Sequence, residues 1–347
     1  MKKSEMKSEE IARLAGVSRS TVSRVINNYA NVPPETRAKV MKVIQDHNYY
    51  PNVSAQVLAG KRARTLGLFL IEPGGVSSDI LTNMLIVSVI ENASSHGYYV
   101  LTHIIRDTAD TDTIRSVREI FFQGRIDGGI FIGAADREPL IDDLIREGFM
   151  VGVMDQEQPI PCQPNRIAAI FNNTSGMKQA AAYLAELGHT RIGVINGDMN
   201  RLSGRTKYEG YMQAMETEGL KVNPAWVLGG SFHENSGCNA VKKLLHCEKH
   251  DLPTAIIAAN DSVAFGAIRA LKEHGLRVPD DMSIIGFDDH PLSARHHPAL
   301  TTLQVDFSEM LGQLTSKLIA RIEHPDEAIH DITAEYTLIV RESCRRI

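Results

Sequence analysis

Residues 8–27 read SEEIARLAGVSRSTVSRVIN, and this stretch decides how the first part of the chain folds. Gly16 interrupts a short helical pattern, because glycine alone adopts the positive φ of a tight turn without steric cost. Ala12 is small enough for two helices to cross closely, and Val17 fills the junction between them. Ser18 is suited to cap a second helix, since its hydroxyl accepts a backbone N–H of the first turn. The stretch therefore predicts a helix-turn-helix.

The predicted second helix has a polar outer face. Its outward side chains are Arg19, Ser20, Ser23 and Arg24. A third helix is expected from Pro34 to about His47, because proline at the first helical position loses no hydrogen bond. A three-helix head with such a polar helix is typical of proteins that read the major groove of DNA. A helical hairpin with an exposed polar face would share part of this pattern.

The charge of the chain is divided unevenly. The net charge is −5, but residues 1–64 carry +7 and the remainder −12. A basic head on an acidic body indicates a polyanionic partner for the head alone. The simpler alternative is a solvated basic tail.

The composition excludes several classes of protein. The chain has 347 residues, 43% of them hydrophobic, with no apolar run long enough to span a membrane and no apolar signal segment at its start. The four cysteines, Cys162, Cys238, Cys247 and Cys344, show no spacing typical of disulfide frameworks or zinc sites. This cysteine usage fits a protein of the reducing cytoplasm.

The segment YYPNVSAQVLAGKRART, residues 49–65, predicts a very short helix between Asn52 and Gly60. Isolated helices of about two turns are marginally stable in water. We expect this segment to be ordered only when something holds it.

Beyond residue 64, apolar runs of four to seven residues alternate with amphipathic helical stretches. This alternation predicts parallel βαβ units, in two successive sets. Four strand ends carry polar residues, Asp155, Asn196, Asn260 and Asp288. Ligands bind beyond the carboxyl ends of such strands, so these residues suit a cleft between two doubly wound sheets.

At this point the chain resembles the lactose-repressor (LacI/GalR) family of bacterial transcription regulators over essentially its whole length. The segments that carry the resemblance are IARLAGVSRSTVSRVIN, ETRAKV, NYYPNVSAQVLAGKR, RTLGL, LGHTRIGVING, ANDSVAFGAIRAL, GLRVPDDMSIIGFDD and PALTTLQVDF. The resemblance implies a lambda-repressor-like all-α helix-turn-helix head and an α/β body of the periplasmic-binding-protein type I fold, with two doubly wound parallel sheets. It implies a homodimeric repressor that binds a pseudo-palindromic operator in double-stranded DNA.

The resemblance also implies DNA contacts. Arg19 and Ser20 stand at the positions that decide operator choice, Arg24 reaches a base, and Ser18, Thr21 and Ser23 touch phosphates or base edges. Asn27 and Asn31 stand at positions that meet the DNA backbone. In the short segment Leu58 corresponds to a minor-groove wedge, accompanied by Asn52, Ala55 and Ala59. The open alternatives are helix capping for Thr21 and Ser23 and packing against the body for Leu58.

The resemblance further implies effector contacts. Asp155 and Asp288 would accept hydrogen bonds from ligand hydroxyls, and Asn260 would both donate and accept. Arg205 or Lys207 would grip the effector, with the choice between them open. Phe232 and Phe307 would form apolar walls. We expect a sugar or sugar derivative, with a nucleobase or another non-sugar effector as the alternative. Asp288 as a helix cap and either phenylalanine as plain core remain open.

Domain boundaries follow from these expectations. We expect a DNA-binding domain at 1–50, a hinge helix and linker at 51–63, and an effector-binding and dimerisation domain at 64–347. Within it, an N-subdomain would comprise about 64–166 and 304–330, and a C-subdomain about 167–303 and 331–347. No leucine heptad follows, so a dimer is expected rather than a larger assembly.

Two other classes of protein fit less well. A solute-binding protein would lack the basic head. An enzyme that uses a dinucleotide would need a G-x-G-x-x-G after a strand, and the chain has none there. The adjacent pair His296 and His297 is more typical of a solvated loop than of a metal site. We therefore expect no enzymatic activity, no cofactor and no metal.

Overall fold

A computed structural model describes residues 6–50, 57, 60–72, 74, 80–157, 163–246, 252–326, 328 and 330–347. Contacts divide the chain into two compact units, Met1–Ala63 and Arg64–Ile347, which we call the head and the body. Among the described residues, no helix is both long and apolar enough to cross a membrane.

The head is a three-helix unit built on the predicted turn. Its helices are α1 (Ser8–Ala15), α2 (Arg19–Ile26) and α3 (Pro34–Asp46). Gly16 has φ 63° and ends α1 in the left-handed region, as predicted. The Ser18 hydroxyl accepts the Thr21 N–H at 3.1 Å and so caps α2. A small core holds the three helices together; it consists of Ile11, Ala12, Ala15, Val22, Val25, Val32 and Val40.

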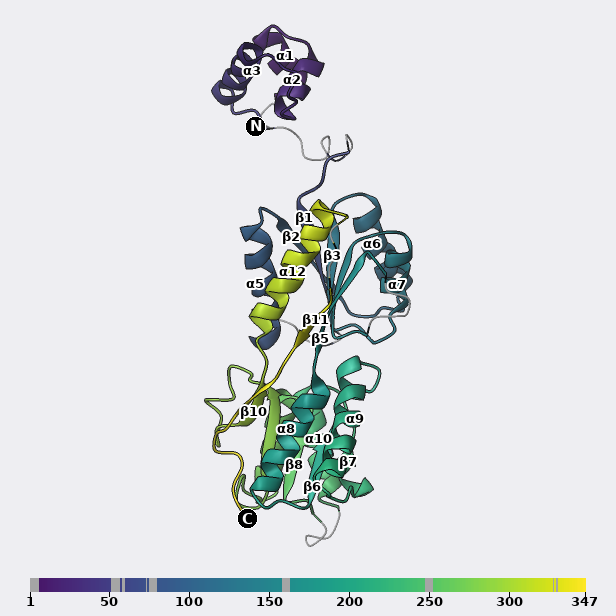
Figure 1. Ribbon diagram of the computed structural model, residues 1–347, viewed down its shortest axis with the longest axis vertical. Helices are drawn as coiled ribbons and strands as arrows, with labels where there is room; N and C mark the ends of the chain where they lie inside the picture. Colours follow the sequence, from purple (N-terminus) through teal and green to yellow (C-terminus); the bar gives the residue numbers. More distant parts are fainter. Residues whose placement is uncertain are drawn as a thin grey trace. The chain divides into compact units, whose positions relative to one another are not determined.

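The body contains two six-stranded sheets with helices on both faces (Figure 1). The first sheet has the order β11-β5-β4-β3-β1-β2, and all its paired strands run parallel. Its strands are β1 (Thr65–Ile71), β2 (Tyr99–Ile105), β3 (Gly128–Ile132), β4 (Val151–Met154), β5 (Arg166–Phe171) and β11 (Ile332–Ala334). Its helices are α5 (Ile80–Ser95), α6 (Thr111–Phe122), α7 (Pro139–Arg146) and α12 (Phe307–Glu323).

The second sheet has the order β12-β10-β9-β8-β6-β7, in which only the pair β10–β12 is antiparallel. Its strands are β6 (Ile192–Ile195), β7 (Val227–Leu228), β8 (Ala255–Ala258), β9 (Ser283–Asp288), β10 (Thr301–Gln304) and β12 (Thr337–Ile339). Its helices are α8 (Asn173–Glu186), α9 (Leu202–Thr217), α10 (Glu234–Leu244) and α11 (Asp261–Glu273), with a 3-10 turn at Pro224–Trp226.

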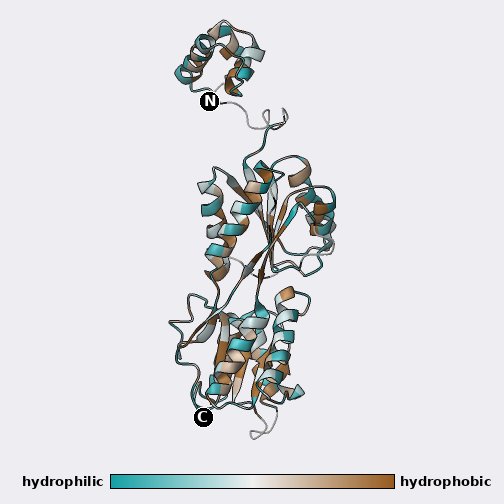
Figure 2. Cartoon of the chain, viewed as in Figure 1, coloured by the Kyte–Doolittle hydropathy of each residue, from teal (hydrophilic) through white to brown (hydrophobic). Residues whose placement is uncertain are grey.

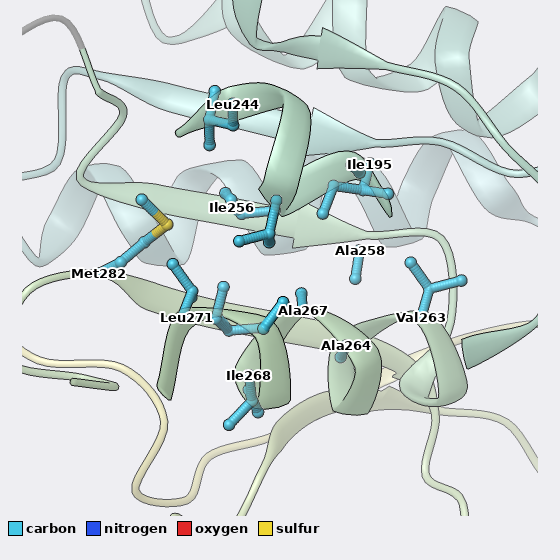
Figure 3. Close-up of a cluster of buried hydrophobic side chains, with 14 of the residues drawn as sticks. Ile195, Leu244, Ile256, Ala258, Val263, Ala264, Ala267, Ile268, Leu271 and Met282 are labelled. Carbon is cyan, nitrogen blue, oxygen red and sulfur yellow. The ribbon is translucent and has the colours of Figure 1, made fainter. Parts of the chain in front are cut away.

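Alternation along the strands gives each sheet two apolar faces. Leu68 packs in the cluster with α5 and α12, while its neighbour Phe69 packs with α6 and α7. In the second sheet Ile256 faces α10 and α11, and Ile257 faces α8 and α9. The strands are accordingly coloured as apolar in Figure 2, and the α10–α11 cluster is drawn in Figure 3. Burial on both faces explains why the strands read as continuous apolar runs.

The structure corrects the expected subdomain boundaries within the body. Strand β5 (Arg166–Phe171) pairs with β4, and β11 (Ile332–Ala334) pairs with β5, so both belong to the first sheet. The chain therefore passes between the halves after Phe171, between β10 and α12, and between β11 and β12. The expected boundaries near 166 and 330 were wrong because an apolar run does not say which sheet it joins. We call the first sheet with its helices the first half of the body, and the second sheet with its helices the second half.

Candidate functional sites

The polar face of α2 is exposed, as the sequence predicts. Ser18, Arg19, Ser20, Ser23, Arg24 and Asn31 are exposed, and Thr21 and Asn27 are half-buried. Part of this face is occupied by local contacts. The Ser18 hydroxyl lies 2.7 Å from that of Ser20 and 2.8 Å from that of Thr21, and Asn27 Nδ2 donates to Ser23 Oγ at 3.2 Å. Ser18 is therefore the residue that caps α2, and the Thr21 hydroxyl contacts the Ser18 hydroxyl. The roles of Thr21 and Ser23 at DNA stay predictions.

The two arginines of α2 differ. Arg19 pairs with Glu9 of α1 at 3.2 Å, although its side chain is 71% exposed. Arg24 forms no ion pair with any described residue, so its guanidinium is available to an outside partner. The sequence had not singled out Arg37, which donates to Asn28 Oδ1 at 2.7 Å and to the Tyr29 carbonyl at 2.5 Å. Arg37 thus holds the turn that follows α2.

The structure does not test the DNA contacts predicted for the segment between Asn52 and Gly60. Asn52, Ala55, Leu58 and Ala59 all lie outside the described residues. Their roles stay predictions.

A large cavity of about 1040 Å³ lies between the two halves of the body, at the carboxyl ends of strands from both sheets. Its volume is at the upper end of the range for small-molecule sites. Six of the seven predicted effector residues line it: Asp155, Lys207, Phe232, Asn260, Asp288 and Phe307. The first half contributes Asp155 and Phe307, and the second half contributes the other four.

Asp155 follows β4 with φ 62°, a backbone conformation that is uncommon outside glycine. The Ser203 hydroxyl donates to its carboxylate at 2.5 Å, which joins the first half to α9 of the second. Burial raises the pKa of Asp155 to about 6, while the Ser203 hydrogen bond and the nearby Lys207 oppose that rise. A buried carboxylate at this place can accept a hydrogen bond from a ligand hydroxyl.

Lys207 is almost completely buried and serves first as a structural cation. Its Nζ donates to the Ala259 carbonyl at 2.6 Å and lies 4.2 Å from the centre of the Phe287 ring. Burial lowers the pKa of Lys207, and the carboxylates of Asp288 and Asp155 oppose that shift. The ammonium group therefore supplies positive charge to the carboxylates of Asp155 and Asp288.

Asn260 organises one wall of the cavity. Its side-chain oxygen accepts the Val263 N–H at 2.9 Å and caps α11, and its amide donates to the Phe232 carbonyl at 3.0 Å. Asn260 thereby positions the loop that carries the Phe232 ring. On the opposite wall Phe307 packs edge-on against Phe171, with ring centres 5.8 Å apart. Phe232 and Phe307 each pack against a core cluster and also line the cavity.

Asp288 ends β9 with φ 99° and lines the cavity. The residues that follow form turns, so Asp288 does not cap a helix in the described chain. Arg205 is the exception among the predicted effector residues. It does not line the cavity, and it pairs instead with Asp136 at 2.5 Å and Glu157 at 2.9 Å. The structure thus corrects the interpretation of Arg205 as an effector contact.

The sequence comparisons agree with this geometry. The profile of bacterial regulatory proteins of the lacI family matches residues 8–52, and the profile of the periplasmic binding protein-like domain matches residues 181–344. The HTH-type transcriptional repressor PurR of Haemophilus influenzae (strain ATCC 51907 / DSM 11121 / KW20 / Rd) is 35% identical over 349 residues, covering 98% of each chain. The chain belongs to the lacI family of bacterial regulatory proteins.

Other proteins are similar over most of this chain. The HTH-type transcriptional regulator DegA of Bacillus subtilis (strain 168) is 34% identical, covering 87% of each chain. A lac repressor dimer bound to operator and the anti-inducer ONPF superposes with a TM-score of 0.81 and 25% identity, covering 98% of this chain and 99% of that one. A complex of the transcriptional regulator CelR with cellobiose superposes with a TM-score of 0.74 and 27% identity, covering 97% and 99%.

As a lacI-family member, the chain is a DNA-binding transcriptional repressor with an effector domain, and not an enzyme. Its head is the helix-turn-helix domain, and its body has the periplasmic-binding-protein type I fold. Among the described residues, no group of three or more His, Cys, Asp or Glu side chains is placed to hold a metal ion. His296 stacks on Phe265 with ring centres 4.8 Å apart, which gives it a packing role.

Sequence reasoning missed several cavity residues of this lacI-family chain. The additional polar ones are Glu72, Thr82, Thr108, Glu138, Asp198, Arg201, Ser203, Ser231, His233, Glu234, Asn235, Ser262, His290 and Tyr336. Arg201 matters most, because its guanidinium lies 5.8 Å from the centre of the Phe232 ring and forms no ion pair with a described residue. The position of Arg201 could have predicted its place in the cavity. It directly precedes α9, and side chains at a helix N-terminus that follows a strand lie at the ligand-binding edge of such sheets.

Proposed function

We propose that this repressor binds an uncharged, polyhydroxylated effector, a sugar or a neutral sugar derivative, in the cavity between the two halves. The observation that carries the proposal is the chemistry of the lining. The acidic side chains there are Glu72, Glu138, Asp155, Asp198, Glu234 and Asp288, against the two fixed cations Arg201 and Lys207. Arg269 lies outside the cavity and partly neutralises the charge of Glu234, since its Nη1 is 2.5 Å from Glu234 Oε1. An acidic lining repels anions but accepts hydroxyl donors.

The apolar surfaces support the same class of ligand. Phe171, Phe232, Phe265 and Phe307 all line the cavity, and flat apolar faces beside hydrogen-bonding side chains suit a sugar ring. The CelR structure, of the same fold, is a complex with cellobiose. A second candidate is a planar heterocycle such as a nucleobase. The pair of Arg201 and Phe232 favours it, because a guanidinium beside an aromatic face can hold a flat ring.

A thermal-shift screen of the full chain tests the proposal. Neutral sugars, including cellobiose, should raise the melting temperature, because a ligand that binds only the folded protein stabilises it. Sugar phosphates and sugar acids should produce no shift, and free nucleobases test the second candidate. Asp288→Ala should abolish the shift caused by any true effector. The proposal fails if only anionic compounds raise the melting temperature.

We propose that residues 1–50 bind the operator, with 51–63 as the hinge and 64–347 as the effector-binding and dimerisation domain. In this proposal Arg19, Ser20 and Arg24 read bases, and Ser18, Thr21, Ser23, Asn27 and Asn31 contact the DNA around them. Asn52, Ala55, Leu58 and Ala59 enter the minor groove. Measuring operator affinity by fluorescence anisotropy, with and without the ligand found in the screen, gives the sign of the effector's action.

Arg24→Ala should weaken binding to the cognate operator by about 1–3 kcal/mol, because the exposed guanidinium loses its contact with a base edge. The change should also relax base preference at one position in each half-site. Binding measured on a library of operator variants checks both effects. Lys42→Ala, which removes an exposed cation from α3, should leave base preference intact. Equal weakening of Arg24→Ala on all sequences would reduce Arg24 to a phosphate contact.

An apolar stripe on α5 supports a dimer. Ile80, Met84, Val87 and Ile90 lie on one face of the helix and are 41–52% exposed, while Leu85 and Val89 face the core. Such a stripe on a monomer marks an interaction surface, and two copies could bury it symmetrically. The lac repressor structure with operator is a dimer.

Met84→Asp should therefore dissociate the dimer, because a buried unpaired carboxylate in the interface costs several kcal/mol. Sedimentation velocity of the full chain at micromolar concentration measures the change. Met212→Asp makes the same substitution at a residue of α9 that is 38% exposed, and it should leave the dimer intact. A dimer that survives Met84→Asp would show that α5 is not at the interface.

A further inference from the structure

Arg205 connects the two halves of the body at a place outside the cavity. It projects from α9 of the second half, and its Nη2 lies 2.5 Å from Asp136 Oδ2 and 2.9 Å from Glu157 Oε2, both in the first half. The Arg205 side chain is 36% exposed and that of Asp136 is 20% exposed, so solvent screens the first pair only partly. Arg205 therefore faces two carboxylates across the boundary between the halves.

Asp136 and Glu157 form a socket for Arg205, that is, a pair of carboxylates held in place by contacts between their loops. The loop after β3 and the loop after β4 are held together, because the Glu157 N–H donates to Asp136 Oδ1 at 3.0 Å and Gln156 Nε2 donates to the Ala135 carbonyl at 2.9 Å. Arg166 fixes the second loop by donating to the Glu157 carbonyl at 2.8 Å. Less side-chain entropy is lost when an ion pair forms with groups that are already held in place.

A backbone hydrogen bond crosses the boundary beside this socket. The Asp136 N–H donates to the Asn200 carbonyl at 2.8 Å, just before α9 begins. Arg201 and Ser203, at the start of the same helix, line the cavity. Separation of α9 from the first half would break the Arg205 ion pairs, the Asp136 hydrogen bond and the Ser203–Asp155 hydrogen bond together.

We call the arrangement in which α9 contacts the first half the closed arrangement. We propose that Arg205, with Asp136 and Glu157, is a latch that stabilises this closed arrangement without touching the effector. The latch sets how much of the closing free energy the protein supplies before a ligand binds. A ligand that binds the closed form needs less binding energy to close a latched protein. The consequence for operator affinity rests on the proposed function, whereas the latch itself concerns the ligand-free body.

Hydrogen exchange of the ligand-free full chain, followed by mass spectrometry, tests the latch. The Asp136 amide reports directly on opening, because its hydrogen bond crosses the boundary between the halves. Arg205→Gln should accelerate exchange in peptides that contain residue 136 by about fivefold, the scale of a pair of partly exposed ion pairs. The substitution is remote in sequence from residue 136, so the intrinsic exchange rate there does not change.

Two further variants make the test specific. Glu157→Gln introduced into Arg205→Gln should add little acceleration, because both partners act through one interaction. Arg277→Gln removes an arginine that also pairs with two carboxylates, Asp280 and Asp281, but within the second half alone, and it should leave the Asp136 amide unaffected. Unchanged exchange in Arg205→Gln would overturn the latch. Equal acceleration in peptides from the central strands β1 and β8 would also overturn it, since that pattern means general destabilisation.

Discussion

Replacing Gly266 with alanine should destabilise the second half of the body by about 3 kcal/mol or more, because it forces two packed helices apart. A Cβ at Gly266 of α11 would lie 1.9 Å from the Glu234 carbonyl oxygen of α10. The reciprocal contact exists at Gly237 of α10, whose Cβ would lie 1.9 Å from the Val263 oxygen. Neither neighbour is a flexible side-chain end, so the backbones themselves must separate. Helix propensity alone would favour alanine by about 1 kcal/mol, so a loss of stability identifies the packing contact.

Urea unfolding of the full chain, followed by circular dichroism, measures the change in the midpoint. The matched control is Gly229→Ala, because Gly229 is exposed, has no atom within 4 Å of an added Cβ and does not have a positive φ. Gly229→Ala should be close to neutral. A Gly266→Ala protein as stable as the parent would mean that α10 and α11 do not pack as closely as the structure shows.

Lys207→Met should cost about 3 kcal/mol at pH 8, because it removes the cation from a buried group of carboxylates. The Lys207 ammonium interacts with Asp288 at the end of β9, with Asp155 after β4, and with Asp261 at the start of α11. Methionine keeps much of the side-chain volume over the Phe287 ring but cannot donate to the Ala259 carbonyl. The loss therefore comes from uncompensated charge and one lost hydrogen bond.

The cost of Lys207→Met should depend on pH. The pKa of Asp155 in the folded protein, about 6, lies above its ordinary value of 3.8. A carboxyl group whose pKa is raised by folding contributes its whole stabilisation when the pH is below its ordinary pKa. That stabilisation is lost as the pH rises through the pKa of the folded protein. Removing Lys207 raises that pKa further, so the penalty should be larger at pH 8 than at pH 5. Urea unfolding at both pH values checks this.

A control and a contrary result are available for this prediction. Lys272→Met removes an exposed lysine from α11 and should change stability little at either pH. If Lys207→Met is equally costly at pH 5 and pH 8, the carboxylates are not the reason for its effect. If it is neutral at both, the ammonium group does not act as their counter-ion.

The helix-turn-helix could be predicted closely because its determinants are local. Gly16 ends α1 through its own backbone freedom, and Ser18 caps α2 through a hydrogen bond to Thr21, three residues away. The same holds for Asp155 and Asp288, which were predicted for the cavity because the ends of parallel strands gather at one edge of a sheet. Periodicity and capping act over a few residues, so a single chain displays them.

Arg205 shows where such reasoning stops. Arg205 and Lys207 are two residues apart on α9, and at 100° per residue they point to nearly opposite sides of the helix. The spacing predicts that they differ, but not which one faces the cavity. The contacts decided it: Lys207 lines the cavity among buried carboxylates, while Arg205 reaches Asp136 and Glu157 in the other half.

The sequence by itself determined the three-helix head, the alternation of strands and helices in the body, and most of the polar residues at the strand ends, because these depend on local backbone preferences and on the period of apolar residues. The tertiary structure alone decided that β5 and β11 join the first sheet, that Arg201 stands beside Phe232, and that Gly237 and Gly266 meet. These contacts join residues far apart in the chain. They are set by which surfaces pack together, and that choice is a property of the whole fold rather than of any segment.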